Sequence, residues 1–271
     1  MRNKLLPVEA SIIAILLLSP GILLPVESSK VTKEKLQEVK CTVFDPIRGI
    51  KVLRAKLTTS QIEKLREALE QVRESGFGDK QIDELESLMK KYKLLPQNTD
   101  LNKLFKEPFK EYYDLTIAEL KERLMERYPF LSTILNKKFS EIKSAGISED
   151  MKVRDVVSVM ADSDRQMNEY GEIENILCFV LINGPGRCLP IPPIPLVPKL
   201  LVFGRAVGLQ PKVKAYMHTR GLFGCQDILT YLQIFFVVVG FIGISITIPT
   251  GFLPGVYVIG MALFVWGCEV D

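Results

Sequence analysis

Histidine, tryptophan and closely spaced cysteines are scarce in this chain. The 271 residues include one histidine, His218, and one tryptophan, and no two of the five cysteines have CxxC spacing. Zincin motifs need two histidines on one helix and zinc ribbons need paired cysteines, so neither class of metal site is expected. His218 has no accompanying GxSxG motif, and we interpret it as a surface or structural residue.

Phosphate-binding loops and basic stripes are also missing. Gly184-Pro185-Gly186 lacks the further glycine and the following helix of a phosphate-binding loop. The net charge is only +3, and basic residues alternate with acidic ones, as at Lys64 and Glu67, which is typical of a solvated helix face. We therefore expect no nucleic-acid partner, and no cofactor motif is present.

Charge is absent from the carboxyl-terminal run Ile228 to Cys268, although the rest of the chain is rich in lysine and glutamate. One interpretation is a transmembrane helical hairpin with spans at Ile228 to Ile248 and Phe252 to Cys268. No lysine or arginine follows Arg220, so the positive-inside rule has nothing to act on. This weakens the membrane interpretation, which remains the alternative.

The same run has features of β-structure. Residues 243–248 alternate large apolar with small or polar side chains, and isoleucine, valine and threonine dominate the stretch before Pro249. We therefore favour a long strand over about Gln233 to Ile248 and a final strand over Val256 to Val265. Fully apolar strands need cover on both faces, and a helical layer could supply one of them.

The amino terminus has the layout of an export signal. Arg2 and Lys4 precede an apolar run, and small residues ending at Ser28 provide a cleavage site. The alternative is an uncleaved membrane anchor, which Glu9 disfavours because a carboxylate is costly in lipid. We predict an exported, extracytoplasmic or membrane-associated protein that begins at or near Ser29.

Export makes disulfide bonds the expected state of some cysteines. We predict at least one disulfide among the four cysteines of the carboxyl-terminal half, with the connectivity left open. These four are Cys178, Cys188, Cys225 and Cys268, and Cys41 is the fifth cysteine.

Three ranges follow the export segment and together predict an α+β fold. Residues 29–57 are predicted to form a β-hairpin, because apolar and polar residues alternate on both sides of the turn sequence Asp45-Pro46-Ile47-Arg48-Gly49. Residues 58–174 are predicted to form a block of antiparallel helices, and residues 175–271 an apolar, β-rich region.

The helical block is predicted from capping boxes and apolar stripes. Capping boxes at Ser60 and Thr116 each begin a helix, and Gly76 and Pro129 end these two helices. Further helices are predicted over Lys80 to Tyr92, Leu101 to Phe105, Phe130 to Ala145 and Met151 to Ala161.

The β-rich region is predicted from short apolar runs and turn residues. A strand over Ile176 to Ile182 is followed by a predicted turn at Asn183 to Gly186. Pro190 to Pro198 holds five prolines and is predicted to be extended. Short strands are predicted over Leu200 to Phe203 and Val213 to His218.

An acidic segment between the block and the β-rich region is the best metal candidate. An EF-hand loop starting at Asp162 would need glycine in place of Met167 and a carboxylate in place of Ile173, so that geometry fails. We interpret the segment as a solvated joint and predict no metal. Its carboxylates are Asp162, Asp164, Glu169, Glu172 and Glu174.

The tail carries one resemblance to known proteins. The segments Gly240-Phe241-Ile242-Gly243-Ile244-Ser245 and Gly260-Met261-Ala262-Leu263-Phe264, with Pro249 between them, resemble the close of a group of exported archaeal proteins of unassigned function. In that group a signal peptide and a variable middle precede a glycine-rich tail thought to be β. The proline run before the tail departs from this pattern. The resemblance implies a β tail outside the cytoplasm and supplies no activity.

These observations predict a non-enzymatic module that binds or supports other molecules at the cell envelope. No group of residues matches a catalytic template, so no catalytic, cofactor-binding or metal-binding residue is predicted. The expected partners are another copy of the chain, an envelope protein or the membrane surface, met at an apolar patch or at an unpaired edge of the tail sheet. Two alternatives are an integral membrane protein held by a carboxyl-terminal hairpin and a hydrolase with an unrecognised carboxylate site.

Overall fold

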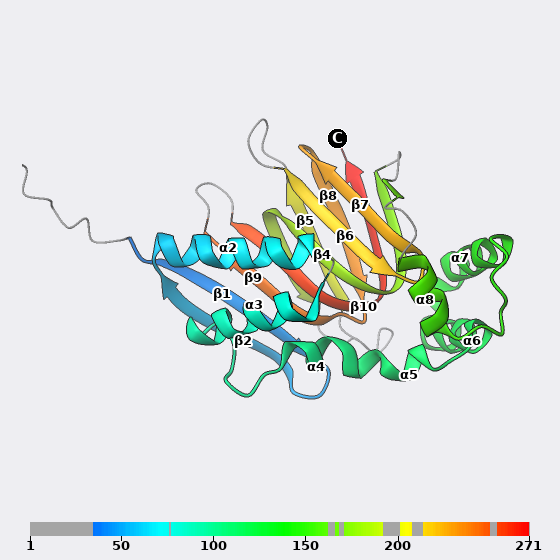
Figure 1. The fold of residues 1–271 in the computed structure, drawn as a ribbon. Coiled ribbons are helices and arrows are strands. Elements are labelled where there is room, and N and C mark those ends of the chain that lie inside the picture. Colours follow the sequence, from blue (N-terminus) through cyan, green and yellow to red (C-terminus); the bar gives the residue numbers. More distant parts are fainter. Residues whose placement is uncertain are drawn as a thin grey trace, which may run out of the picture. The chain divides into compact units, whose positions relative to one another are not determined.

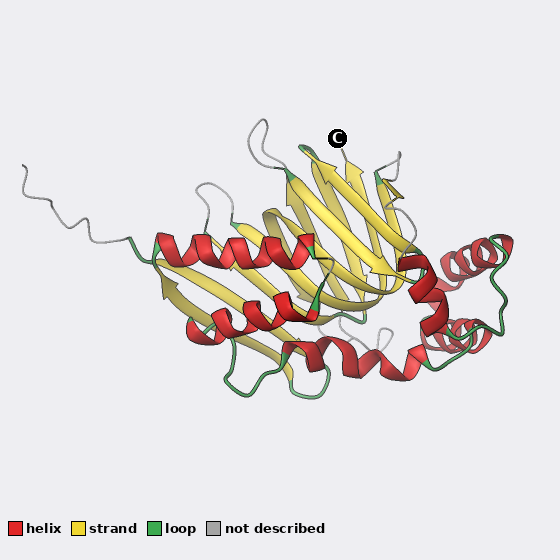
Figure 2. Cartoon of the chain, in the orientation of Figure 1, coloured by secondary structure: helices red, strands yellow, loops and turns green. Residues whose placement is uncertain are grey.

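The computed structural model describes residues 35–75, 77–161, 166–167, 171–191, 201–207, 214–249 and 254–270. Residues Lys35–Asp271 form one compact unit that contains the hairpin, the helices and the tail strands. Helices lie against one side of a large sheet (Figure 2), which confirms the predicted α+β class. Residues 1–28, which were predicted to form an export signal, and residues 192–200 of the proline run lie outside the described residues.

One sheet contains ten strands of the described chain, in the order β2-β1-β9-β10-β8-β5-β4-β6-β7-β3. All pairings are antiparallel except that of β3 with β7. The strands are β1 (Gln37–Asp45), β2 (Gly49–Leu57), β3 (Gln166–Met167), β4 (Glu172–Ile191), β5 (Leu201–Val207), β6 (Ala215–Gly221), β7 (Gly224–Thr230), β8 (Gln233–Val239), β9 (Ile242–Ile248) and β10 (Gly255–Val270).

Strand β4 is the longest strand and joins two parts of the sheet. Its first part pairs with β10, whereas its last residues, from Gly186 to Ile191, pair with β5. Strand β5 also pairs with β8, and β8 pairs with β10. The four strands therefore form a closed circuit of pairings. Figure 1 shows the curvature of β4 and β10.

Two apolar clusters cover the two faces of the tail strands. One cluster joins helix side chains to β1, β9 and one face of β10, including Ile244 and Ile259. The other contains only strand and loop residues, such as Val180, Phe236 and Val258, and lies between the curved parts of the sheet. Covering both faces with apolar side chains explains why the tail carries no charge.

The described chain contains seven α-helices, of which six match predicted helices and α5 was not predicted. Helix α2 begins after the capping box of Thr58 and Gln61, two residues before the predicted Ser60, whereas the predicted box at Thr116 is confirmed. Helices α2, α3 and α4 lie across β1, β2 and β9 in Figure 1. The helices are α2 (Thr59–Glu74), α3 (Asp79–Lys91), α4 (Leu101–Lys106), α5 (Lys110–Tyr113), α6 (Ile117–Arg127), α7 (Ser132–Ser144) and α8 (Val153–Ala161).

The predicted amino-terminal hairpin is confirmed as β1 and β2. Asp45 Oδ1 accepts hydrogen bonds from the backbone N–H of Ile47 at 2.8 Å and of Arg48 at 3.0 Å, which fixes the turn. Gly49 has a φ of +78°, the left-handed conformation that closes such three-residue loops. Strand β1 also pairs with β9, so the hairpin is part of the main sheet.

The predicted turn at Asn183 to Gly186 is wrong, because β4 continues through it. Gly184 pairs with Val256, and a Cβ at this glycine would lie 3.0 Å from the Cβ of Ala206. Proline and glycine here mark the place where β4 exchanges β10 for β5, which needs a bend and close backbone approach. Strands β3 and β7 were not predicted.

The tail is β-structure, and the transmembrane helical hairpin is wrong. The long strand predicted over Gln233 to Ile248 is interrupted at Gly240 and Phe241, where Gly240 adopts a φ of +65°, and so forms β8 and β9. Both run antiparallel to β10 in one continuous register, so they follow the same direction. The final strand is longer than predicted and runs over Gly255–Val270. Among the described helices, none combines the length and the apolarity that a membrane crossing requires.

Candidate functional site

The open edge of the sheet is provided by β2. In the described part of the chain β2 pairs with β1 and with no other strand. Tail strands β8, β9 and β10 each lie between two partner strands, so none of these three provides the unpaired tail edge that we predicted. At the other end of the sheet β7 is partly covered by the two-residue strand β3. The longest edge available for pairing therefore belongs to the hairpin.

The two faces of β2 differ. Leu57 belongs to the apolar cluster beneath the helices, and Leu53 and Ala55 pack against this cluster. Ile50 and Val52 point to the other face and are 44% and 48% exposed. We call the outward side chains Ile50, Val52, Arg54 and Lys56, together with the free backbone edge of β2, the β2 edge.

Positive charge gathers at one end of the β2 edge. Lys40 lies opposite Arg54, and Glu38 lies opposite Lys56 in the register of β1 and β2. The guanidinium of Arg54 is 3.6 Å from the carboxylate of Glu38, and both side chains are more than half exposed. This end of the strand pair therefore carries three cations, Lys40, Arg54 and Lys56, and one carboxylate, that of Glu38. The other end, at Ile50, is apolar.

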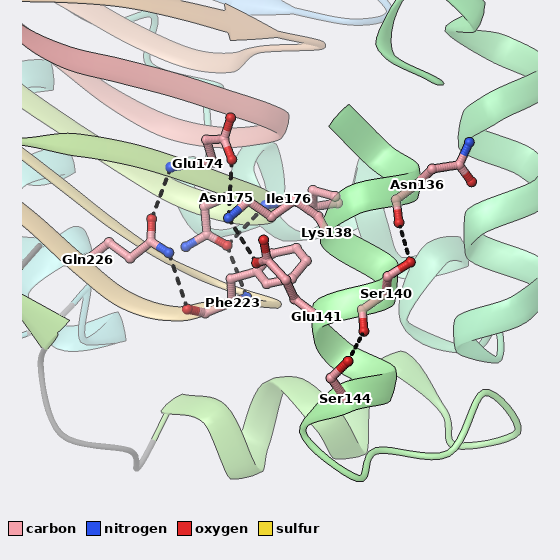
Figure 3. Close-up of polar contacts among 10 residues, drawn as sticks. All are labelled: Asn136, Lys138, Ser140, Glu141, Ser144, Glu174, Asn175, Ile176, Phe223 and Gln226. Carbon is pink, nitrogen blue, oxygen red and sulfur yellow. Dashed lines mark hydrogen bonds and ion pairs between the residues drawn. The ribbon is translucent and has the colours of Figure 1, made fainter. Parts of the chain in front are cut away.

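A separate cavity of about 420 Å³ is lined by residues of α7 and of the sheet. Figure 3 shows the polar contacts of this region. Lys138 of α7 reaches the sheet, and its Nζ is 3.0 Å from Glu141 Oε2 and 3.1 Å from Glu174 Oε2. Partial burial lowers the pKa of the Lys138 ammonium, but the bonds to Glu141 and Glu174 outweigh it and hold this pKa above its ordinary value. Lys138 is therefore a charged link between helix and strand.

Buried amides complete the link beneath the cavity. The Asn175 side chain donates to Thr219 Oγ1 and to the carbonyl of Gly224, both at 3.1 Å, and its oxygen accepts from the N–H groups of Ile176 and Phe223. Figure 3 shows Gln226 beside it, accepting from the backbone N–H of Glu174. These polar groups bind one another, which favours a structural role for the cavity wall.

Replacing Lys138 by alanine should lower the free energy of unfolding by about 1–2 kcal/mol. Glu174 is only 15% exposed and would lose its cation. Urea unfolding followed by circular dichroism measures the loss. Replacing its exposed neighbour Lys137 by alanine is the matched control and should change stability little. Equal stability of the two variants would contradict the assigned link.

The acidic segment contributes two carboxylates to this cavity. Glu172 and Glu174 both line it, and Glu172 accepts a hydrogen bond from the indole N–H of Trp266 at 2.8 Å. Asp162, Asp164 and Glu169 lie outside the described residues. Among the residues that the structure describes, no group of three potential ligands is close enough to hold a metal ion.

His218 is buried rather than on the surface. Its Nδ1 is 2.5 Å from Asp227 Oδ1, and its ring stacks against Phe77 with centroids 5.6 Å apart. The Tyr216 hydroxyl donates to the same carboxylate oxygen at 2.9 Å. Nε2 of His218 is buried and has no hydrogen-bond partner in the described part of the chain. Asp227, the one charged residue of strand β7, is the sequence signal for this pair, which was not predicted.

The cysteines do not show the predicted disulfide at the positions described. Cys41, Cys178 and Cys268 carry free thiols, and the side chain of Cys188 lies outside the described residues. Burial raises the pKa of the Cys41 thiol to about 12 and raises the pKa of Cys178 further. Burial and then the carboxylate of Glu172 raise the pKa of Cys268, which is partly exposed.

Iodoacetamide at pH 8 should therefore label Cys268 in the folded protein and leave Cys41 and Cys178 unmodified. The thiolate is the form that reacts with iodoacetamide. Cys41 and Cys178 are buried from solvent, and their raised pKa values keep them protonated at pH 8. Peptide mass spectrometry before and after unfolding in guanidinium measures the difference. Labelling of Cys41 at the same rate in both states, or a disulfide at Cys268, would contradict the assignment.

Comparison with known proteins adds no relative: no family model, no curated protein and no solved structure matches this chain.

Proposed function

We propose that this protein is a non-enzymatic binding module of the cell envelope, which takes up an extended segment of a partner protein at the β2 edge. The observation that carries the proposal is the nine-residue strand β2, which pairs only with β1 among the described residues and bears exposed Ile50 and Val52. A partner strand would gain backbone hydrogen bonds along the edge and apolar contacts on its outer face.

The placement of exposed apolar side chains supports this choice of surface. Ile47, at the tip of the hairpin, is 91% exposed, so the apolar end of the β2 edge continues into the turn. Natural edge strands are often kept short or interrupted by proline, because a long free edge pairs with other chains. Strand β2 is neither short nor interrupted by proline, and the protection that it carries is the charge of Lys51, Arg54 and Lys56, which disfavours pairing with other cationic strands. Export, which places the edge where envelope proteins are found, rests on the charged and apolar layout of residues 1–28.

The proposal is tested by the substitution Val52→Lys, with Val159→Lys as its control. Both valines are exposed, but Val159 lies on α8, away from β2 in Figure 1. A peptide array of β-prone nine-residue segments is probed with the full-length protein and both variants. Val159→Lys should leave binding to the array unchanged, and Val52→Lys should weaken it at least about tenfold. An added strand would remove water from the lysine ammonium at position 52, which costs free energy.

Two results would overturn this function. One is binding that is unaffected by Val52→Lys. The other is loss of binding with both valine variants alike, which would show a general effect of added charge.

A further inference from the structure

We infer that the β2 edge selects an antiparallel strand whose outward side chains are acidic at its amino-terminal end and apolar at its carboxyl-terminal end. This inference rests on the proposed function and names the partner chemistry. It is carried by the order of side chains along the outer face of β2, which runs from Ile50 and Val52 to Arg54 and Lys56.

The register follows from strand geometry. Side chains on one face of neighbouring antiparallel strands lie directly opposite one another, about 5 Å apart. Acidic residues opposite Lys56 and Arg54 would compensate the cations, and apolar residues opposite Val52 and Ile50 would cover exposed carbon. An antiparallel partner strand runs from the Lys56 end to the Ile50 end of β2. Its outward residues, from its amino-terminal end, are therefore acidic, acidic, apolar and apolar, and one inward residue separates each outward residue from the next.

The inward residues of the partner would continue the other face of β2. Leu53 and Ala55 are partly buried there and pack against the cluster beneath the helices. Small or β-branched side chains opposite them would extend this apolar contact. Lys51 is exposed on the same face and limits the apolar stretch at the turn end. Threonine suits these positions because it is β-branched and keeps a hydroxyl for solvent.

Charge disfavours a second copy of the chain as the occupant. Two β2 strands paired about Leu53 would place Arg54 of each copy opposite Val52 of the other, with Lys56 opposite Ile50. The cations of both strands would then lie on one face with Lys40 beside them, and no apolar pair would form there. Cationic edge residues thus oppose self-pairing but leave an acidic strand acceptable. Antiparallel pairing is the more stable mode and is the one β2 already uses with β1.

Three synthetic peptides test the inference by fluorescence anisotropy with the full-length protein. The probe is Thr-Glu-Thr-Glu-Thr-Val-Thr-Val-Thr, the second has the reverse order, and the third has lysine in place of glutamate. The probe should bind about tenfold tighter than either of the others, because the reversed peptide mismatches all four outward cross-strand pairs and the lysine peptide places like charges at two of them. This preference should shrink at high salt, which screens exposed charges.

A charge exchange provides the decisive control. The double variant Arg54→Glu and Lys56→Glu should lose its preference for the glutamate peptide and bind the lysine peptide instead. The variant Lys110→Glu and Lys143→Glu changes the net charge equally, at helical sites away from β2, and should keep the original preference. A misfolded variant would not gain affinity for the lysine peptide, so tight binding of this peptide by the Arg54→Glu and Lys56→Glu variant cannot result from misfolding.

Failure of the inference differs from failure of the proposed function. Equal binding of the three peptides, all abolished by Val52→Lys, would overturn the charge pattern but keep strand capture at the edge. Tighter binding of the reversed peptide would overturn the antiparallel orientation. No binding of any peptide, together with concentration-dependent self-association that Val52→Lys abolishes, would replace the acidic partner by a second copy of the chain. No binding and no effect of Val52→Lys in any assay would overturn both.

Discussion

Replacing Gly260 by valine lowers the free energy of unfolding by about 3 kcal/mol and is the most damaging single substitution that we expect in the tail. Gly260 of β10 lies opposite Gly243 of β9. A Cβ at Gly260 would lie 2.7 Å from the Cα of Gly243 and 2.9 Å from the Phe241 ring, and closer still to the carbonyl oxygen of Ile242. Two of these neighbours are backbone atoms, which cannot move without disturbing the pairing of β9 and β10.

The Phe241 ring adds to this crowding, because it lies against both Gly260 and Gly243. This ring also packs edge-on against Phe44 of β1, with centroids 5.3 Å apart. Guanidinium unfolding measures the cost. Gly78→Ala is the matched control, because its nearest neighbour is the flexible end of Gln81, so we expect a loss below about 1 kcal/mol. Comparable stabilities of the valine variant and the wild type would contradict the close approach of β9 and β10.

Replacing Asp227 by alanine should also cost about 3 kcal/mol. A carboxylate can only accept hydrogen bonds, so the bond from His218 places a proton on Nδ1 of the imidazole. Removing Asp227 leaves that buried N–H without its acceptor, and Nε2 has no partner in the described structure to compensate. The buried histidine ring would then carry two unpaired nitrogens.

The variant Asp227→Asn separates the hydrogen bond from the packing. An asparagine oxygen accepts the same bonds from His218 and Tyr216, so its cost should stay near about 1 kcal/mol. Thermal unfolding of both variants, followed by calorimetry, measures the difference. A wild-type melting temperature for Asp227→Ala would show that the His218 bond contributes nothing to stability.

Local chemistry explains which elements the sequence predicts. The turn between β1 and β2 depends on Asp45 and Gly49, both of which act within five residues, and the hairpin was predicted correctly. The capping box at Thr116 is local in the same sense and is confirmed. The strand character of the tail follows from its alternation and from β-branched residues, and it too is confirmed.

Non-local features were missed because they depend on strand order. Glycine and proline at 184–186 give the same local signal for a turn and for an exchange of partners, and only the positions of β5 and β10 distinguish the two. The His218 bond depends on the register of β6 with β7. The open edge at β2 depends on the order of the whole sheet, so the sequence pointed instead to the tail, which is the most apolar part of the chain.

Hydrogen–deuterium exchange of the full-length protein with and without the glutamate peptide tests strand capture most directly. New backbone hydrogen bonds would slow exchange at amides of β2, over Gly49–Leu57, and leave those of β7 unchanged. Our account predicts protection confined to β2 and absent in Val52→Lys. Protection centred on the cavity at Lys138, or no protection at β2 with the peptide bound, would contradict it.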